Sequence, residues 1–195
     1  VERVEVGQLV PLHAAGDEAR EVRRHPLDRQ LLDEQRVVLR LAGDEIRAAV
    51  AENSVRVVPI VADLTKPRQV AAVVSRTMKL FGRIDVLVTN AGGPPVGAFA
   101  DLDDATWEAG VALTLMSTVR AIRAVLPHMQ KRKWGRIINI TSIAAKQPIN
   151  DLIISSSLRP GILGLTRVLA SQYAKDGILI NSVAPGFMRT ARMEE

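Results

Sequence analysis

Short runs of β-branched and other apolar residues alternate with longer helical patterns from about residue 36 onward. Each run is apolar almost throughout, which is typical of strands covered on both faces of a sheet. Strands that alternate with helices favour right-handed crossovers and a parallel sheet. The sequence therefore predicts an α/β fold with a doubly wound, Rossmann-like parallel sheet, with strands near residues 36–41, 55–61, 85–89, 135–141 and 178–183.

Helical patterns fill the gaps between these runs. Acidic and hydroxyl residues at 63–65 and 101–104 are typical of helix starts, and Gly82 and Gly177 are placed to end helices. The predicted helices span residues 44–52, 66–80, 103–129 and 152–175.

The composition is that of one globular domain: 195 residues, of which 47% are hydrophobic and 24% charged. The net charge of +5 comes from arginines scattered among acids, and aromatic residues make up only 3%. A solvated surface explains this charge better than nucleic-acid binding does. No apolar run approaches the roughly 20 residues that span a bilayer, and the charged start does not resemble a secretory signal. We therefore expect a cytoplasmic protein with no nucleic-acid or membrane partner.

The first 35 residues differ from the remainder of the chain. They contain eight acids, no lysine and only two glycines, Gly7 and Gly16. The chain has no cysteine, and His13 and His25 stand apart without the spacing of metal ligands, so no metal site is expected. We assign residues 1–35 to a divergent amino-terminal segment and residues 36–195 to a partial Rossmann domain.

Polar and small residues follow four of the predicted strands. Asp63 and Leu64 come first, Asn90, Ala91 and Gly92 second, Ser142 third, and a Pro-Gly-containing segment at 184–190 last. Ligands of doubly wound sheets bind at the carboxyl ends of the strands, where small residues allow a close approach to the backbone.

These four strand ends, in this order and at these intervals, resemble the short-chain dehydrogenase/reductase family over residues 36–195. Within that family the chain is most similar to proteins called 3-oxoacyl-[acyl-carrier-protein] reductases. The segments that support this subgroup are residues 92–95, 124–129 and 146–148.

The resemblance implies NADP or NAD as cofactor and a small carbonyl or alcohol substrate, with hydride transfer between nicotinamide C4 and the substrate carbon. It leaves the choice between the two cofactors open. In the family pattern, residues at these strand ends contact the adenine, form the floor beside the adenosine ribose, and flank the nicotinamide. The residues that match are Asp63 and Leu64 for the adenine, Asn90, Ala91 and Gly92 for the ribose floor, and Pro185, Gly186, Met188 and Thr190 for the nicotinamide.

The resemblance also implies four catalytic positions. Ser142 matches the family's serine. The tyrosine position falls on Ser155, the lysine position on Arg159 and the asparagine position on Thr114. Arg159 can still bind ribose hydroxyls, but a serine hydroxyl is far less acidic than a phenol, whose pKa is about 10. The chain's one tyrosine, Tyr173, lies some 27 Å along the same predicted helix and cannot replace it.

Residues 1–35 contain no match to the glycine-rich turn that cradles the pyrophosphate in the family. The family also continues for some fifty residues beyond Thr190. We expect that residues 1–35 come from a shifted reading frame or a misassigned start, and that the carboxyl end is a truncation. The alternative is that residues 1–35 form a divergent cap over the sheet edge. Three hypotheses for function follow: an oxidoreductase of doubtful competence, a catalytically silent nucleotide- or partner-binding protein, and a truncated product without function.

The resemblance further implies a homo-oligomer built through the helices near 103–129 and 152–175. Apolar residues at suitable spacing on these helices support it, although covering the sheet is the simpler role. These residues are Val111, Leu115, Val119, Ile122 and Ala170.

Overall fold

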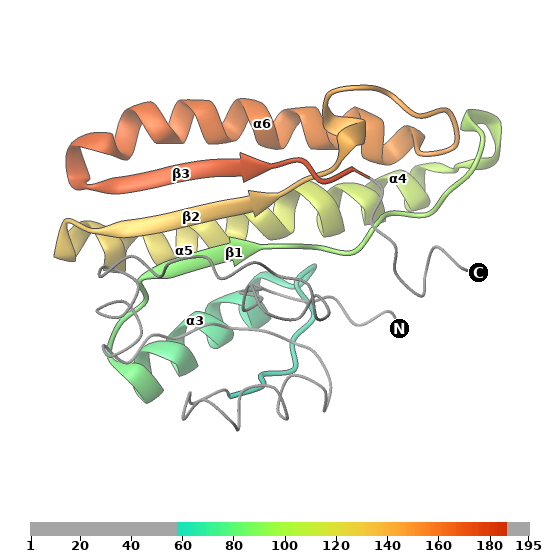
Figure 1. Cartoon of the computed structure of the whole chain (residues 1–195). Coiled ribbons are helices and arrows are strands. Elements are labelled where there is room, and N and C mark those ends of the chain that lie inside the picture. The colour runs from blue at the N-terminus through green and yellow to red at the C-terminus, as the bar shows by residue number, and fades with distance from the viewer. Residues whose placement is uncertain (1–57, 187–195) are drawn as a thin grey trace, which may run out of the picture.

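A computed structural model of the chain describes residues 58–186 (Figure 1). The predicted strand at 36–41 and the predicted helix at 44–52 lie outside the described residues. So do Met188 and Thr190.

The described sheet has three parallel strands in the order β1-β2-β3. Their bounds are Val86–Thr89 for β1, Gly135–Ile140 for β2 and Ile178–Val183 for β3. The three predicted strands in these regions are thus confirmed. Consecutive parallel strands joined through helices give the Rossmann-like α/β arrangement that the alternating pattern predicts.

The strand predicted at 55–61 is not confirmed. Its described part, residues 58–61, has no regular structure. Pro59 lacks the N–H that a ladder needs, and within residues 58–186 no strand pairs with this segment. The apolar run at 58–61 therefore forms no strand with the described residues.

Two long helical regions connect the strands, and a third helix precedes them, as predicted. Helix α3 spans Pro67–Phe81. Between β1 and β2 the chain runs through α4 (Asp104–Gly110), the π-helical stretch η2 (Val111–Met116) and α5 (Ser117–Arg132). Between β2 and β3 lies α6 (Ile153–Tyr173). Short 3-10 turns complete the described elements: η1 (Phe99–Asp101), η3 (Ile143–Ala145) and η4 (Ala174–Asp176).

Local side chains explain several helix ends. Asp103 caps α4, because its carboxylate accepts a hydrogen bond from the Thr106 N–H at 2.8 Å. Asp63 does not cap α3 as its position suggested, since the residue before that helix is Lys66. Gly82 and Gly177 follow helical segments in left-handed conformations, with φ of 73° and 70°.

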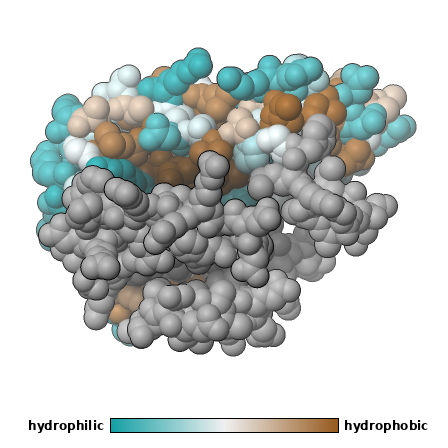
Figure 2. Space-filling model, viewed as in Figure 1, coloured by the Kyte–Doolittle hydropathy of each residue, from teal (hydrophilic) through white to brown (hydrophobic). Residues whose placement is uncertain are grey.

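The helices cover one face of the described sheet. Helix α3 packs against α5, α5 packs on β1 and β2, and α6 packs on β3. Burial alternates along β2 and β3, as expected for strands with one covered face. Apolar side chains also point to the other face, and Leu179 and Val183 are exposed there within the described part of the chain. Figure 2 shows apolar surface on this side, below a hydrophilic upper edge. The expectation of strands covered on both faces is therefore not met among residues 58–186.

The continuous helical region Asp104–Arg132 is long and apolar enough to cross a membrane by length and composition alone. The sequence had suggested that no stretch would pass this test. Core packing accounts for its character, because Ile122, Val125 and Met129 are buried in the main apolar cluster. We regard it as a core helix of the domain.

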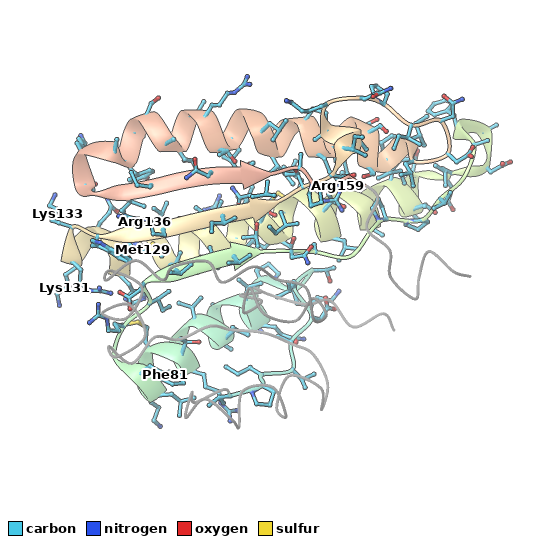
Figure 3. The ribbon with its side chains drawn as sticks, in the orientation of Figure 1. Phe81, Met129, Lys131, Lys133, Arg136 and Arg159 are labelled. Carbon is cyan, nitrogen blue, oxygen red and sulfur yellow. The ribbon has the colours of Figure 1, made fainter. Side chains whose placement is uncertain are left out.

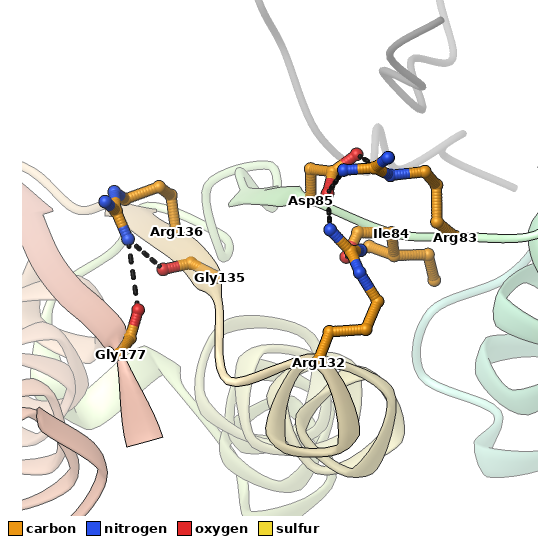
Figure 4. A network of polar contacts seen from close by, with 7 residues as sticks. All are labelled: Arg83, Ile84, Asp85, Arg132, Gly135, Arg136 and Gly177. Atoms are coloured by element: carbon orange, nitrogen blue, oxygen red, sulfur yellow. Dashed lines mark hydrogen bonds and ion pairs between the residues drawn. The ribbon is translucent and has the colours of Figure 1, made fainter. Parts of the chain in front are cut away.

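Arginines tie the strands together at their amino ends (Figure 4). The Asp85 carboxylate accepts hydrogen bonds from Arg83, at 2.8 and 2.9 Å, and from Arg132 on α5. Burial alone would raise the pKa of Asp85, but these hydrogen bonds outweigh it and lower the pKa. Arg136 donates to the carbonyl oxygens of Gly135 and Gly177 at 2.8 and 3.2 Å. The amino end of the sheet is thus fixed by charge-assisted bonds.

A buried polar network joins the strands to α6. The Thr89 hydroxyl donates to Asn139 Oδ1 at 2.8 Å, and Asn139 Nδ2 donates to Thr166 Oγ1 at 2.9 Å. Thr166 donates to the Ile162 carbonyl at 2.8 Å, so its contact with Ser182 at 2.7 Å uses the serine hydrogen. Asn139 therefore connects all three strands with α6.

We expect Asn139→Ala to lower the free energy of unfolding by about 2 kcal/mol, because it leaves the buried Thr89 hydroxyl without its Asn139 partner and removes one of the hydrogen bonds of the buried Thr166 hydroxyl. Denaturant unfolding followed by circular dichroism measures this loss. Asn181→Ala is the control, since Asn181 is an exposed asparagine on the adjacent strand. Equal losses in the two variants would contradict the role of the network.

Candidate active site

The carboxyl ends of the strands come together at one edge of the sheet. The Thr141 N–H donates to the Val183 carbonyl at 2.7 Å, and the Ile143 N–H donates to the Pro185 carbonyl at 2.9 Å. These bonds continue the β2–β3 pairing past the strand ends. Because β1 runs parallel to β2, residues 90–92 leave the sheet at the same edge. The structure thus brings Asn90–Gly92, Ser142 and Pro185–Gly186 to one edge.

Ser155 and Arg159 form a pair beside this edge. They lie four residues apart on α6 and therefore on one face of it. Arg159 Nε donates to Ser155 Oγ at 2.9 Å, and Arg159 Nη1 donates to the Thr141 carbonyl at 3.0 Å. Both side chains are buried, with exposed fractions of 5% and 7% for Ser155 and Arg159. Figure 3 shows Arg159 next to the ends of β2 and β3, far from Lys133 and Arg136.

Ser142 follows directly on Thr141 and caps the turn η3. Its hydroxyl oxygen accepts a hydrogen bond from the Ala144 N–H at 3.1 Å. The turn η3 packs against α6. Ser142 is therefore held close to the Ser155–Arg159 pair through its neighbour Thr141.

Thr114 lies in the π-helical stretch η2, which packs against α6. Its exposed fraction is 1%, and among the described residues it is the one with a buried side-chain oxygen that lacks a hydrogen-bond partner. Single π turns occur often at functional sites. No pattern in the sequence predicted this widened turn, although the family resemblance pointed to Thr114 itself.

Asp63 and Leu64 have different environments. The Asp63 carboxylate accepts two hydrogen bonds from Thr65, at 2.9 and 2.6 Å, and the side-chain bond lowers the pKa of Asp63 most. Leu64 is buried in the apolar core with an exposed fraction of 4%, so its side chain serves core packing. Arg120 on α5, which the sequence did not single out, donates to the Thr65 carbonyl at 2.8 Å and holds this turn in place.

The glycines at this edge leave room for a cofactor. A Cβ added at Gly92 or at Gly186 would meet no atom within 4 Å. A dinucleotide can therefore approach the backbone after β1 and after β3 closely. The charged Asp63 carboxylate is chemically suited to the adenine portion. The open space at Gly92 and Gly186 is suited to the ribose portion, and the buried Arg159 is suited to the nicotinamide portion. The residues present thus fit a nicotinamide dinucleotide.

The site lacks an effective proton donor among the described residues. Ser155 offers an alcohol in place of a phenol, and the charge of Arg159 is fixed. Tyr173 is the last residue of α6, so the structure keeps it far from Ser155. Helix α6 continues unbroken through Pro160. The site can therefore bind and orient better than it can supply a proton.

The sequence model of the family described as short chain dehydrogenase matches residues 30–195. The chain belongs to this family. The family's proteins are oxidoreductases that use a nicotinamide cofactor, and the parallel sheet with its glycine-lined carboxyl edge agrees with that membership.

Several curated relatives are oxidoreductases. The chain is 39% identical to a (2S)-[(R)-hydroxy(phenyl)methyl]succinyl-CoA dehydrogenase subunit of Thauera aromatica over 55% of this chain and 45% of that protein. It is also 39% identical to D-beta-hydroxybutyrate dehydrogenase of Rhizobium meliloti, over 52% of this chain and 41% of that protein. The chain thus spans less than half the length of these relatives.

Solved structures agree with the fold. A short-chain dehydrogenase from Streptomyces avermitilis matches with a TM-score of 0.69 at 30% identity, over 75% of this chain and 55% of that one. The protein ElxO, solved with NADP bound, matches with a TM-score of 0.69 at 28% identity, over 77% of this chain and 62% of that one.

Proposed function

We propose that the chain binds a nicotinamide dinucleotide along the carboxyl edge of its sheet and supports hydride transfer to a carbonyl substrate only at a greatly reduced rate. The observation that carries this proposal is the Ser155–Arg159 pair beside the open, glycine-lined edge. Asp63, Leu64, Asn90, Ala91, Gly92, Pro185 and Gly186 hold the nucleotide in this proposal, while Ser142, Ser155, Arg159 and Thr114 surround the reacting atoms.

When bound, the nicotinamide supplies or accepts the hydride. The chain's own residues orient the substrate oxygen through the hydroxyls of Ser142 and Ser155. A proton must also reach that oxygen during reduction, and neither a serine alcohol nor a guanidinium gives one up readily near neutral pH. Loss of a general acid costs about 10²–10⁴ in rate, so turnover in this chain is slow.

We propose a β-oxoacyl or β-hydroxyacyl compound as the substrate class. The resemblance to 3-oxoacyl-[acyl-carrier-protein] reductases supports it. So do the names of the two curated relatives, both of which describe a hydroxyl group on the carbon β to a carboxyl or thioester. The choice between NADP and NAD stays open in this proposal, and the cytoplasmic location stays a prediction.

A second candidate is nucleotide binding with no turnover at all. It is favoured by the fact that Arg159 already donates hydrogen bonds to Ser155 Oγ and to the Thr141 carbonyl. These bonds bind the guanidinium to the protein itself, which makes it a poorer partner for ribose hydroxyls than a mobile ammonium.

We also propose that the chain forms a homo-oligomer through the helices near 103–129 and 152–175, which are α4, η2 and α5 together with α6. Ile122 cannot contribute, because it is buried in the core beneath the sheet. Val111, Leu115, Val119 and Ala170 are only partly buried. Val168, which the sequence did not suggest, adds an exposed apolar side chain on α6.

Titration with NADPH and NADH, followed by nicotinamide fluorescence, tests the proposed nucleotide site. We expect binding by the chain and at least about 10-fold weaker binding by Gly92→Val, because the new side chain enters space that no protein atom fills. Gly164→Val is the matched control, since a Cβ at Gly164 on α6 also meets no atom within 4 Å. No binding by the unaltered chain, or equal binding by both variants, would overturn the proposal.

A further inference from the structure

Arg159 carries a buried positive charge without a carboxylate partner among residues 58–186. The ion pairs in this part of the chain involve Asp85 and Asp176, which lie at the amino end of the sheet. A buried guanidinium without a counter-charge is costly unless hydrogen bonds and an anion compensate for lost water. In agreement, burial lowers the pKa of Arg159.

The hydrogen bonds of the pair leave donors free. A guanidinium has five N–H groups, and in the described part of the chain Arg159 uses one on Ser155 Oγ and one on the Thr141 carbonyl. Ser155 accepts from Arg159, so its own hydroxyl hydrogen is available. Ser142 likewise accepts from the Ala144 N–H and keeps its hydrogen.

This set of groups offers donors and a positive charge, and no negative charge. A neutral carbonyl needs one or two such donors. A carboxylate accepts about four hydrogen bonds and forms its strongest ones with guanidinium groups. The chemistry of the set is therefore matched to an oxyanion better than to a neutral ketone.

We propose that Arg159, Ser155 and Ser142 form a binding site for the carboxylate of a small ligand. The inference rests on the proposed function only in taking this carboxylate to belong to the substrate, in which the carboxylate then competes with the carbonyl oxygen for the hydroxyls of Ser142 and Ser155. The exchange of a phenol and an ammonium for an alcohol and a guanidinium then changes the ligand that the site selects, in addition to slowing proton transfer.

The test compares 3-hydroxybutyrate with its neutral methyl ester by isothermal titration calorimetry on the full chain, without nucleotide. We expect the carboxylate to bind at least about 10-fold more tightly than the ester, since hydrogen bonds to charged groups are the strong ones. Arg159→Leu should abolish this preference. Arg167→Leu should preserve it, because Arg167 is an exposed arginine on the same helix. Equal binding of the two probes, or a preference that survives Arg159→Leu, would overturn the proposal.

Removal of Arg159 also removes a bond between α6 and β2, so a second variant guards against misfolding. Ser155→Ala keeps the bond from Arg159 to the Thr141 carbonyl and should weaken carboxylate binding by about 5-fold. Ser157→Ala, an exposed serine on the same helix, should not. An unchanged affinity in Ser155→Ala would contradict the site. Since no nucleotide is present, carboxylate binding by a chain that fails to bind NADPH would support this inference while rejecting the proposed function.

Discussion

Ser155→Tyr combined with Arg159→Lys should raise the rate of NADPH oxidation with acetoacetate by about 10²–10⁴-fold. The phenol is much more acidic than the serine alcohol, and an ammonium four residues along the helix lowers its pKa further. In the present chain Ser155 and Arg159 already share one face of α6 in hydrogen-bond contact, so the two new side chains start from suitable positions. Steady-state kinetics with saturating nucleotide measures the gain.

A matched control places the phenol two residues away. Ser157→Tyr combined with Arg159→Lys puts it at an exposed position of α6 and should leave the rate at that of the unaltered chain. Adding Thr114→Asn to the Ser155→Tyr, Arg159→Lys variant should increase the rate further, because Thr114 lies in η2, which packs against α6. An equal gain in the control would show that the position of the phenol does not matter and would refute the assignment of Ser155.

Gly177→Ala should lower the free energy of unfolding by about 3 kcal/mol or more, the largest stability effect expected here. Gly177 has a φ of 70°, and a Cβ there would lie 2.2 Å from the Lys133 carbonyl oxygen. Lys133 is itself in a left-handed conformation, with a φ of 53°. Its carbonyl is part of the backbone and cannot move aside as a flexible side chain would. Chemical denaturation followed by circular dichroism measures the loss.

Gly82→Ala separates the two causes of this loss. Gly82 has nearly the same φ of 73°, but a Cβ added there meets no atom within 4 Å. It should therefore cost only the left-handed strain, about 1 kcal/mol. If Gly177→Ala cost no more than Gly82→Ala, the close approach of Gly177 to Lys133 would be wrong.

The sequence predicted the strands and helices best where the apolar pattern was continuous and its ends were marked. Residues 135–141 and 178–183 are of this kind, and the strands found there agree within one residue. Gly82 and Gly177 marked helix ends because positive φ favours glycine. The segment 55–61 had the same apolar character, yet its described part is no strand. A strand needs a partner for its ladder, and composition alone does not report one.

The candidate site was predictable as a set of positions and not as a set of contacts. The family resemblance placed Ser142, Ser155, Arg159 and Thr114, and it allowed Arg159 to bind ribose hydroxyls. Within the described residues Arg159 contacts Ser155 and the Thr141 carbonyl, and these contacts depend on how α6 packs against the end of β2. The π-helical turn at Thr114 and the bond from Arg120 to Thr65 depend equally on tertiary packing. No local pattern encodes such contacts.

A single sample can show whether this edge of the sheet binds a nicotinamide nucleotide while proton transfer is impaired. The unaltered chain is saturated with NADPH, acetoacetate is added, and nicotinamide fluorescence reports binding and oxidation together. We expect the nucleotide to be bound and to be oxidised at least about 100-fold more slowly than in the Ser155→Tyr, Arg159→Lys variant. Bound nucleotide that is oxidised as fast as in that variant would refute impaired proton transfer, because another group would then have to supply the proton.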